Sequence, residues 1–310
     1  MRPTISIVIP VYNRQELILR CLDSIAMQSY PPLEIIIVDN GSTDATCLAV
    51  IDWIEKQKAK KKYRLLIEDK RGVTFARQKG LDNAVGDFIL FFDSDDVMNP
   101  DLIEKVTNKI MTSPDLDLVC WRCRIHQLDN SIRIPLFQPR KPIENHLIHS
   151  LLRTQGYVLK KDFLLKSGGW KKNLPVWNDL ELGLRILLLR PKIKYIEEIL
   201  VDVYAQKNSI TGENFTSKEG EWETSLEEMR ETVANSQYLD KERILRILNY
   251  RKVILAAHYK REGNKTSAKK LMTEVSEKIK FREKLILKIS YLYTAAGLRG
   301  AWHIARLFLI

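Results

Sequence analysis

Residues 88–96 constrain the fold more than any other stretch of this 310-residue chain, because five consecutive apolar residues lead directly into three carboxylates. An apolar run without polar alternation predicts a strand buried on both faces of a sheet. Such strands belong to α/β folds, in which ligands bind beyond the carboxyl ends of the strands. Asp93, Asp95 and Asp96 would repel one another there unless a cation lies among them. The stretch therefore predicts a divalent-metal site.

The same acids could instead form a turn or cap a helix, as Asp residues often do after a strand. Asn99 followed by Pro100, however, already supplies a start signal for the next helix. The three acids are then left without a capping role, which favours the metal site.

Strand-like and helix-like segments alternate over the first 115 residues, and this order predicts a mostly parallel sheet flanked by helices. Strands are expected at 4–10, 34–38, 65–68, 88–92, 116–127, 131–135, 193–196 and 200–204. From about residue 219 onward the pattern is helical. We therefore expect an α/β domain over residues 1–215 and a basic helical region over residues 216–310.

Charge and cysteine content narrow the class of protein. Of the net charge of +11, residues 251–310 carry +10, from 14 basic and 4 acidic residues, which suggests an anionic partner surface. A nucleic acid is not favoured, because no recognition motif accompanies this charge. Because a strand-like run begins almost at the first residue, no signal peptide is expected, and no apolar stretch has the length expected of a membrane span. The four cysteines then suggest reduced thiols in a cytoplasmic protein. Cys120 and Cys123 lack further zinc ligands, and His146 and His149 are expected at the surface.

Two earlier strand ends would lie beside the acids on the same sheet edge. The first presents Pro10, Val11, Tyr12 and Asn13, and the second ends in Asp39. An aromatic ring beside an acid suits a nucleoside. Together these strand ends predict a nucleotide-plus-metal pocket.

In these motifs the chain resembles the inverting, nucleotide-sugar-dependent glycosyltransferases of family 2, which have the GT-A fold. The matching residues follow in order over roughly residues 4–211: 6–13 (SIVIPVYN), 37–44 (IVDNGSTD), Gly72-Val73, Ala76-Arg77, Gly80, Gly86, 92–96 (FDSDD), 168–170 (GGW) and 178–182 (NDLEL). The resemblance implies an α/β GT-A domain with a helical C-terminal extension.

The resemblance also implies roles for individual residues. Nucleotide contacts are expected from Pro10, Val11, Tyr12, Asn13, Asp39, Arg77, Asp93 and Ser94. Mn²⁺ or Mg²⁺ would be bound by Asp95, Asp93 and Asp96 and would neutralise the diphosphate leaving group. Asp179 would act as the general base that deprotonates the acceptor hydroxyl, and a single displacement inverts the configuration. Sugar or acceptor contacts are expected from Trp177, Asn178 and Trp170.

Three positions depart from the family pattern. Asn178 stands where a Glu usually precedes the base, Gln78 replaces a common Asn, and a His that is often found near Lys207 is absent. The expected function is transfer of a sugar to a glycan or lipid-linked acceptor in cell-surface polysaccharide biosynthesis. A haloacid-dehalogenase-like phosphohydrolase and a non-catalytic nucleotide- or glycan-binding subunit are the alternatives.

The C-terminal segment, residues 281–310, mixes large apolar residues with lysine and arginine. This composition suits a helix lying on an anionic membrane, such as the inner face of the cytoplasmic membrane. It equally suits helices packed on the catalytic domain or on another subunit. Both interpretations remain open from the sequence.

Overall fold

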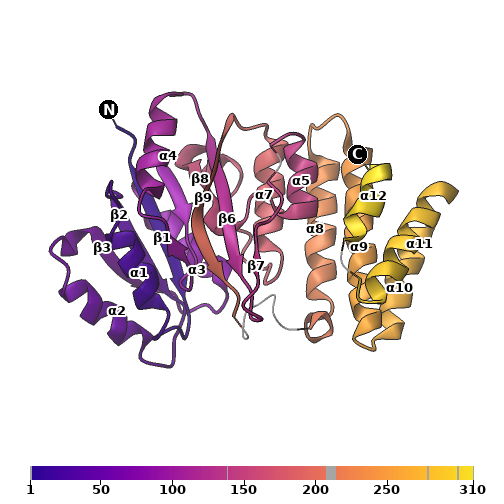
Figure 1. The fold of residues 1–310 in the computed structure, drawn as a ribbon, viewed down its shortest axis with the longest axis horizontal. Coiled ribbons are helices and arrows are strands. Elements are labelled where there is room, and N and C mark those ends of the chain that lie inside the picture. Colours follow the sequence, from indigo (N-terminus) through magenta and orange to yellow (C-terminus); the bar gives the residue numbers. More distant parts are fainter. Residues whose placement is uncertain (1, 138, 207–213, 278, 299, 310) are drawn as a thin grey trace.

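The computed structural model describes residues 2–137, 139–206, 214–277, 279–298 and 300–309. A mixed α/β half contains the sheet, and an all-helical region extends from one side of it (Figure 1). The predicted fold class is therefore confirmed. None of the described helices combines the length and the apolarity needed to cross a membrane.

The described residues form one nine-stranded sheet with the order β3-β2-β1-β4-β8-β6-β9-β5, and β7 pairs with β6. The strands are β1 Ile5–Val11, β2 Glu34–Asp39, β3 Tyr63–Ile67, β4 Phe88–Phe91, β5 Val97–Met98, β6 Leu118–His126, β7 Ile132–Arg133, β8 Tyr157–Lys160 and β9 Ile193–Tyr204. The first four are parallel, β8 is antiparallel to both β4 and β6, and β9 is parallel to β6. Most long strands thus point toward the same edge.

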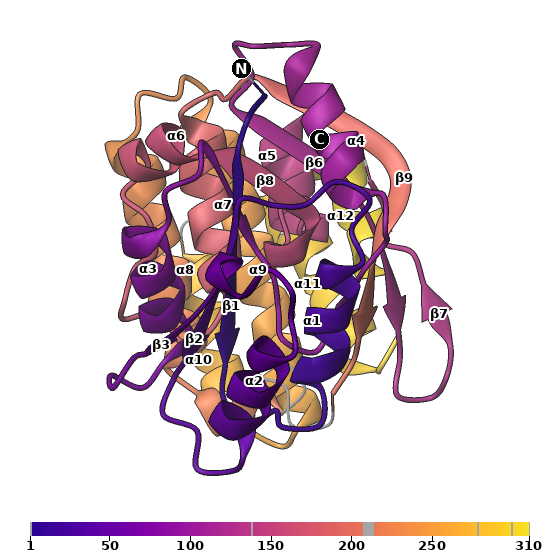
Figure 2. The same cartoon turned by 90° about the vertical axis from the view of Figure 1, so that its left-hand side faces the viewer.

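Helices cover both faces of the sheet (Figure 2). They are α1 Ile18–Ala26, α2 Thr46–Glu55, α3 Val73–Asn83, α4 Leu102–Met111, α5 Pro142–His149, α6 Lys161–Lys166, α7 Asn178–Leu188, α8 Glu221–Asn235, α9 Lys241–Arg261, α10 Lys265–Ser276, α11 Phe281–Ala295 and α12 Ala301–Leu309, with 3₁₀ turns η1 Lys60–Lys62, η2 Thr154–Gly156 and η3 Phe215–Lys218. Apolar residues of α1, α2 and α4 pack on one face, and those of α3 and α7 pack on the other.

The apolar runs explain the central strands. Every residue of β1, β2 and β4 is buried, as expected for strands covered on both faces. Helix α3 approaches β1 closely at Gly80, where a Cβ atom would lie 2.2 Å from a methyl carbon of Val8. Glycine at this position therefore lets α3 lie against the sheet and carry Arg77 to the strand ends.

The structure differs from the sequence-based expectation at several places. Residues 193–204 form one strand, because β9 stays paired with β6 while Glu197 and Glu198 are accommodated in an irregularity. Helix α4 begins at Leu102, two residues after the expected Pro100. His146 is fully buried rather than exposed, because its ring bonds the carbonyl of Leu180 at 2.9 Å and the amide of Leu152 at 3.2 Å.

The cysteines agree with the packing interpretation. Cys120 and Cys123 are both buried on β6, and they belong to the hydrophobic clusters on opposite faces of the sheet. All four cysteines are free thiols.

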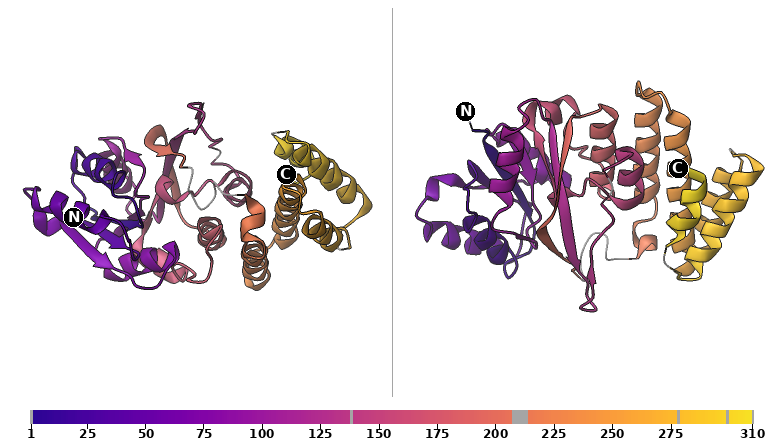
Figure 3. Two further views of the ribbon diagram at one scale, coloured as in Figure 1. Left: turned by 90° about the horizontal axis from the view of Figure 1, so that it is seen from below. Right: turned by 45° about the horizontal axis from the view of Figure 1, so that its top comes forward.

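The helical region shares a core with the sheet. One continuous hydrophobic cluster joins Val8 and Phe91 of the sheet to Leu180 of α7, Trp222 of α8 and Val253 of α9. Helices α8 to α12 are stacked beyond α5 and α7, on the side away from the sheet, as the two views in Figure 3 show. The division into separate domains at residue 215 stays a prediction.

Candidate active site

The carboxyl ends of β1, β2 and β4 bring the predicted site residues to one edge of the sheet. Val11 at the end of β1 pairs with Asp39 at the end of β2, and the chain leaving β4 supplies Asp93 two residues after Phe91. Parallel strands make this neighbourhood unavoidable, because their carboxyl ends meet at the same edge.

Asp39 has an unsatisfied acceptor. The side chain is 2% exposed, and its Oδ2 accepts hydrogen bonds from the amides of Gly41 at 3.1 Å and Ser42 at 2.9 Å. No hydrogen bond from the described residues satisfies the buried Oδ1. Burial, with the nearby Asp39 charge, raises the pKa of the Cys47 thiol to about 11. An N–H donor on a ligand would satisfy Asp39 Oδ1.

Tyr12 is the exposed part of this corner. Its side chain is 40% exposed, and the Arg71 guanidinium lies 4.5 Å from the ring centroid. Asn13, with φ of 50°, instead supports the neighbouring turn, because its Oδ1 accepts from the amide of Thr43 at 2.8 Å. A cation and an aromatic ring therefore stand beside the Asp39 acceptor.

Pro10 and Val11 do not offer side chains to this corner. Both are buried in β1, and the Val11 carbonyl accepts a hydrogen bond from the amide of Asn40 at 2.9 Å. They shape the strand end, and their direct contact with a nucleotide stays a prediction. Ser94 is likewise buried, at 7% exposure.

Arg77 connects the two carboxyl-rich parts of the site. Its guanidinium donates to Asp93 Oδ1 at 2.8 Å and to Asn178 Oδ1 at 2.9 Å, although Asn178 lies 101 residues away in sequence. The bridge links the end of β4 with the start of α7. It places Asp179, the residue after Asn178, on the same side as the β4 acids.

Trp170 and Asn178 support this bridge. The Trp170 ring lies 4.6 Å from the Arg77 guanidinium carbon and edge-on to Phe91, and it is 3% exposed. Asn178 is 8% exposed, with its carboxamide oxygen occupied by Arg77. The Trp170 ring packs against Arg77 and has no open face, and the expected sugar contact from Trp170 stays a prediction.

Asp96 does not belong to an open metal site. It is 2% exposed, its Oδ2 accepts from Gln155 Nε2 at 2.7 Å, and its Oδ1 accepts from the Tyr204 amide at 3.0 Å. Burial and the charges of Asp93 and Asp95 raise its pKa well above the usual range. One oxygen thus ties β9 to the strand ends and the other ties the η2 turn to them, and a metal-binding role of Asp96 stays a prediction.

Asp95 is a half-buried carboxylate that lies among like charges. Burial and the charge of Asp93 raise its pKa to about 6, and its nearest described cation, the Arg14 Nε, lies 3.8 Å away. Asp93 keeps 31% of its side chain exposed despite its bond to Arg77. No group of three or more His, Cys, Asp or Glu residues suited to a metal occurs among the described residues. The pair still fits Mg²⁺ or Mn²⁺, because such ions commonly use one or two carboxylates and complete their shell with phosphate oxygens and water.

Asp179 lies in the first turn of α7 and is half-buried. Its Oδ1 accepts from the amide of Leu180 at 2.8 Å. The buried hydroxyl of Tyr157 has no hydrogen-bond partner among the described residues, and burial and the charge of Asp179 raise its pKa. Arg251 of α9 is a second neighbour of Asp179. Burial lowers the pKa of Arg251 to about 10, and the charge of Asp179 partly offsets this decrease.

The chain entering α7 is held by the helical region. Trp177 has a φ of 48°, and its ring packs edge-on against Trp222 with the ring centroids 4.9 Å apart. The guanidinium carbon of Arg251 lies 4.6 Å from the centroid of the Trp177 ring. The Ser225 hydroxyl donates to the Val176 carbonyl at 2.7 Å. The sequence predicts neither Arg251 nor Tyr157 here, because no local motif marks a residue that reaches the site from a distant element.

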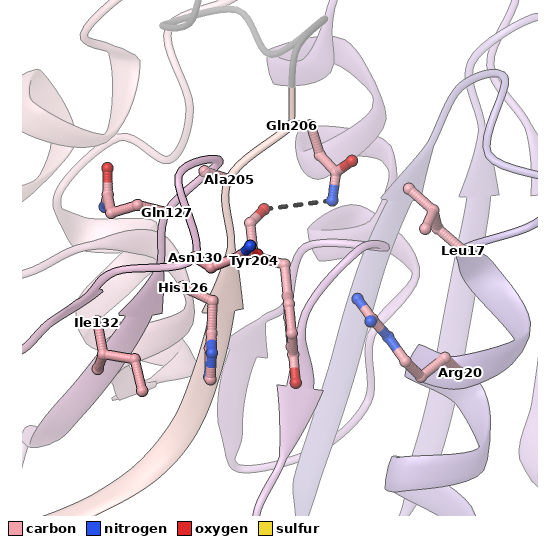
Figure 4. A pocket seen from close by; sticks show the side chains of 9 residues that line it. All are labelled: Leu17, Arg20, His126, Gln127, Asn130, Ile132, Tyr204, Ala205 and Gln206. Carbon is pink, nitrogen blue, oxygen red and sulfur yellow. Dashed lines mark hydrogen bonds between the residues drawn. The ribbon is translucent and has the colours of Figure 1, made fainter.

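A cleft of about 290 Å³ opens beside the acids (Figure 4). Its wall contains a stack in which the Tyr204 ring lies between Arg20 and His126. The guanidinium carbon of Arg20 is 3.9 Å from the centroid of the Tyr204 ring, and the centroids of the Tyr204 and His126 rings are 4.6 Å apart. Arg20 also donates to the Asp95 carbonyl at 2.7 Å. Three carboxamides complete the polar lining, from Gln127, Asn130 and Gln206. Lys207 and the absent histidine beside it lie outside the described residues.

Comparison with known proteins supports the family that the sequence motifs resemble. Residues 6–158 match the model of Glycosyl transferase family 2. The amylovoran biosynthesis glycosyltransferase AmsB of Erwinia amylovora is 30% identical over 167 residues, which cover 52% of this chain and 54% of AmsB. Matches to three curated relatives span only 15%, 33% and 54% of their own lengths.

Solved structures share the fold at low identity. S. aureus TarS 1–349 in complex with UDP-GlcNAc has a TM-score of 0.74 at 16% identity, covering 94% of this chain and 87% of that one. The mannosyltransferase PcManGT of Pyrobaculum calidifontis, in complex with GDP-Man and Mn²⁺, has a TM-score of 0.63 at 18% identity, with coverage of 99% and 87%. These likenesses confirm the GT-A fold. The match to the family model shows that residues 6–158 form a domain of glycosyl transferase family 2.

Proposed function

We propose that this protein transfers a sugar from a nucleotide-sugar donor to a glycan or lipid-linked acceptor, with inversion at the anomeric carbon. The observation that carries the proposal is the Asp93–Arg77–Asn178 bridge, which joins the donor-side acid to the residue next to Asp179. A single displacement needs a leaving-group site and a base held in fixed relation to each other. The bridge provides that relation.

The nucleoside would occupy the corner formed by Asp39, Tyr12 and Arg71. The unsatisfied Asp39 Oδ1 can accept from a base N–H, and the exposed Tyr12 ring can lie against the base or ribose. Arg71, already beside Tyr12, adds positive charge near the phosphates. These contacts suit a nucleotide but do not select among bases.

The diphosphate would lie over Asp93 and Asp95. These two carboxylates would hold Mg²⁺ or Mn²⁺, which when bound supplies a Lewis acid for the diphosphate leaving group. Arg77 orients Asp93 through their ion pair, and Arg14 and Arg20 add positive charge around Asp95. The Mn²⁺ bound by the neighbour PcManGT supports this choice of ions.

Asp179 would take the proton from the acceptor hydroxyl as that oxygen attacks. Tyr157 and Arg251 would orient the carboxylate from the inner side, since both lie close enough for its charge to affect them. The cleft beside Asp95 is proposed to hold a neighbouring sugar unit, because side-chain amides and ring edges suit hydroxyl groups. A role in cell-surface polysaccharide biosynthesis is supported by the likeness to AmsB.

The phosphohydrolase alternative has no support, because the acids follow the fourth strand of a family 2 domain. A non-catalytic binding subunit is separated from an enzyme by activity. We expect one of the UDP-, GDP- or dTDP-sugars to stabilise the protein in a thermal-shift screen with Mn²⁺. That donor should release its nucleoside diphosphate during turnover.

This release should stop with EDTA and fall at least a hundredfold, or by roughly 3 kcal/mol, in Asp95→Ala. The exposed acid of α6 offers a matched control, Asp162→Ala, which should turn over normally. Nucleotide binding without any turnover would favour the binding subunit. Undiminished turnover in Asp95→Ala would contradict the metal assignment.

A further inference from the structure

Helix α11 presents an exposed apolar stripe at the end of the molecule farthest from β3 (Figure 1). Phe281 is 82% exposed, Leu285 55%, Ile289 44% and Leu292 49%. Spacings of three and four residues place these four side chains on one face of the helix. A continuous stripe of this kind on an outer helix indicates a surface that another body covers.

The opposite face of α11 is already used. Leu287, Ser290 and Thr294 are buried, and the helix packs against α9 and α12. Trp302 of α12 also turns inward, with its ring edge-on to His149 at 4.7 Å. The packed-helix interpretation is therefore correct for one face, and it leaves the stripe unexplained.

The charges beside the stripe have one sign. Arg282, Lys284 and Lys288 are all exposed and flank the apolar residues. The one acid of the helix, Glu283, turns inward, with its side chain 14% exposed and its Oε1 3.9 Å from Arg246. Every charged residue of α11 that is exposed is thus basic.

We propose that this face of α11 docks the protein on the surface of an anionic lipid bilayer. Apolar side chains would enter the boundary between headgroups and acyl chains, while the flanking lysines and arginine meet lipid phosphates. The helix is about 22 Å long, at about 1.5 Å per residue, which suits a segment lying flat on the surface rather than crossing it.

A second copy of the chain fits this face less well. A symmetric pair would bring the same surface patch of both subunits together, and with it the two sets of basic residues. Like charges at close range oppose such a pair, whereas an anionic membrane neutralises them. The proposal does not depend on the donor or on catalysis, since α11 does not contribute to the residues described for the site.

The test is flotation of the full chain with vesicles of phosphatidylcholine, with and without phosphatidylglycerol. We expect the chain to float only with the anionic vesicles and to be released by high salt. The double variant Leu285→Glu/Ile289→Glu should lose at least tenfold in partitioning. Lys284→Glu/Lys288→Glu should lose anionic selectivity.

Helix α2 supplies a matched control. Leu48 and Ile51 are 64% and 45% exposed at the other end of the molecule, and Leu48→Glu/Ile51→Glu should float like the wild type. Equal flotation of both double variants would overturn the proposal. Absence of flotation, with a concentration-dependent dimer that Leu285→Glu/Ile289→Glu abolishes in light scattering, would overturn it in favour of a second copy.

Discussion

Arg77 is the residue that organises the site. It is 5% exposed, bonds Asp93 and Asn178, and lies on the Trp170 ring. A buried guanidinium needs such partners, because removing it from water without them is costly. Because Asn178 is neutral, Arg77 is bonded to one carboxylate, that of Asp93, instead of two. The departure from the family pattern at Asn178 therefore alters the charge next to the proposed base without removing the bridge.

His146 and Gly183 form a second constraint at the residue scale. The buried imidazole lies against α7, and a Cβ atom at Gly183 would lie 2.3 Å from its Nε2. Burial lowers the pKa of His146 to about 4, so the ring is neutral at ordinary pH. We expect Gly183→Ala to cost about 1–3 kcal/mol of unfolding free energy in chemical denaturation.

In a His146→Ala background, Gly183→Ala should instead raise the free energy of unfolding. With the ring absent, alanine fits and gains up to about 1 kcal/mol from its helix propensity. The two single variants and the double variant form a cycle that isolates the contact. Additive effects in that cycle would show that Gly183 is needed for another reason.

Sequence patterns reach some of these residues and not others. Asp39, Asp93 and Asp95 lie where the order of parallel strands predicts, because strand ends meet at one edge. Arg77 lies on helix α3, and only the family resemblance implies its place in the site. Asp96 and Trp170 carry the family motif, but their packing and hydrogen bonds decide their environment. Tyr157 and Arg251 reach the site, and His146 reaches α7, through tertiary packing, which leaves no periodic signal in the sequence.

At the scale of elements, α7 and the chain before it determine where Asp179 lies. Three constraints converge on this segment: Asn178 on Arg77, Val176 on Ser225, and Trp177 between Trp222 and Arg251. The left-handed backbone of Trp177 is strained for a large side chain, and these contacts hold it in place. Helices α8 and α9 thus position the proposed base.

We expect Arg251→Ala to lower kcat at least tenfold, about 1.4 kcal/mol, while the dissociation constant of the nucleotide stays unchanged. Arg251→Lys keeps the charge but loses the planar stacking on Trp177, and should recover part of the rate. Steady-state kinetics and nucleotide titration measure the two effects separately. The control is Lys260→Ala on α9, the helix that also carries Arg251. This variant removes a cation that lies 5.2 Å from the centroid of the Tyr291 ring. An equal loss in both variants would indicate general destabilisation of α9.

The order of elements follows from the sequence, whereas the pairing of the later strands does not. The apolar runs of β1, β2 and β4 are by themselves enough to predict buried parallel strands. Local composition divides residues 193–204 in two because Glu197 and Glu198 interrupt the apolar pattern, but pairing with β6 continues past them. Strand pairing over long sequence distances overrides local composition.

At the scale of the whole molecule, the C-terminal helices serve the site and the surface at once. The inner faces of α8 and α9 complete the core that contains α7. The outer face of α11 carries apolar and basic side chains into solvent. Composition predicts a basic helical region, but only the packing of the helices separates the residues that support the site from those left exposed.

The proposed function rests above all on Asp179 as the base of a sugar transfer from a nucleotide donor. It is tested by comparing turnover of the identified nucleotide-sugar by the wild type, Asp179→Asn and the exposed control Glu231→Gln of α8. We expect Asp179→Asn to lose about a hundredfold or more in kcat and to bind the nucleotide as the wild type does, with the control unaffected. Normal turnover by Asp179→Asn would show that another group removes the proton.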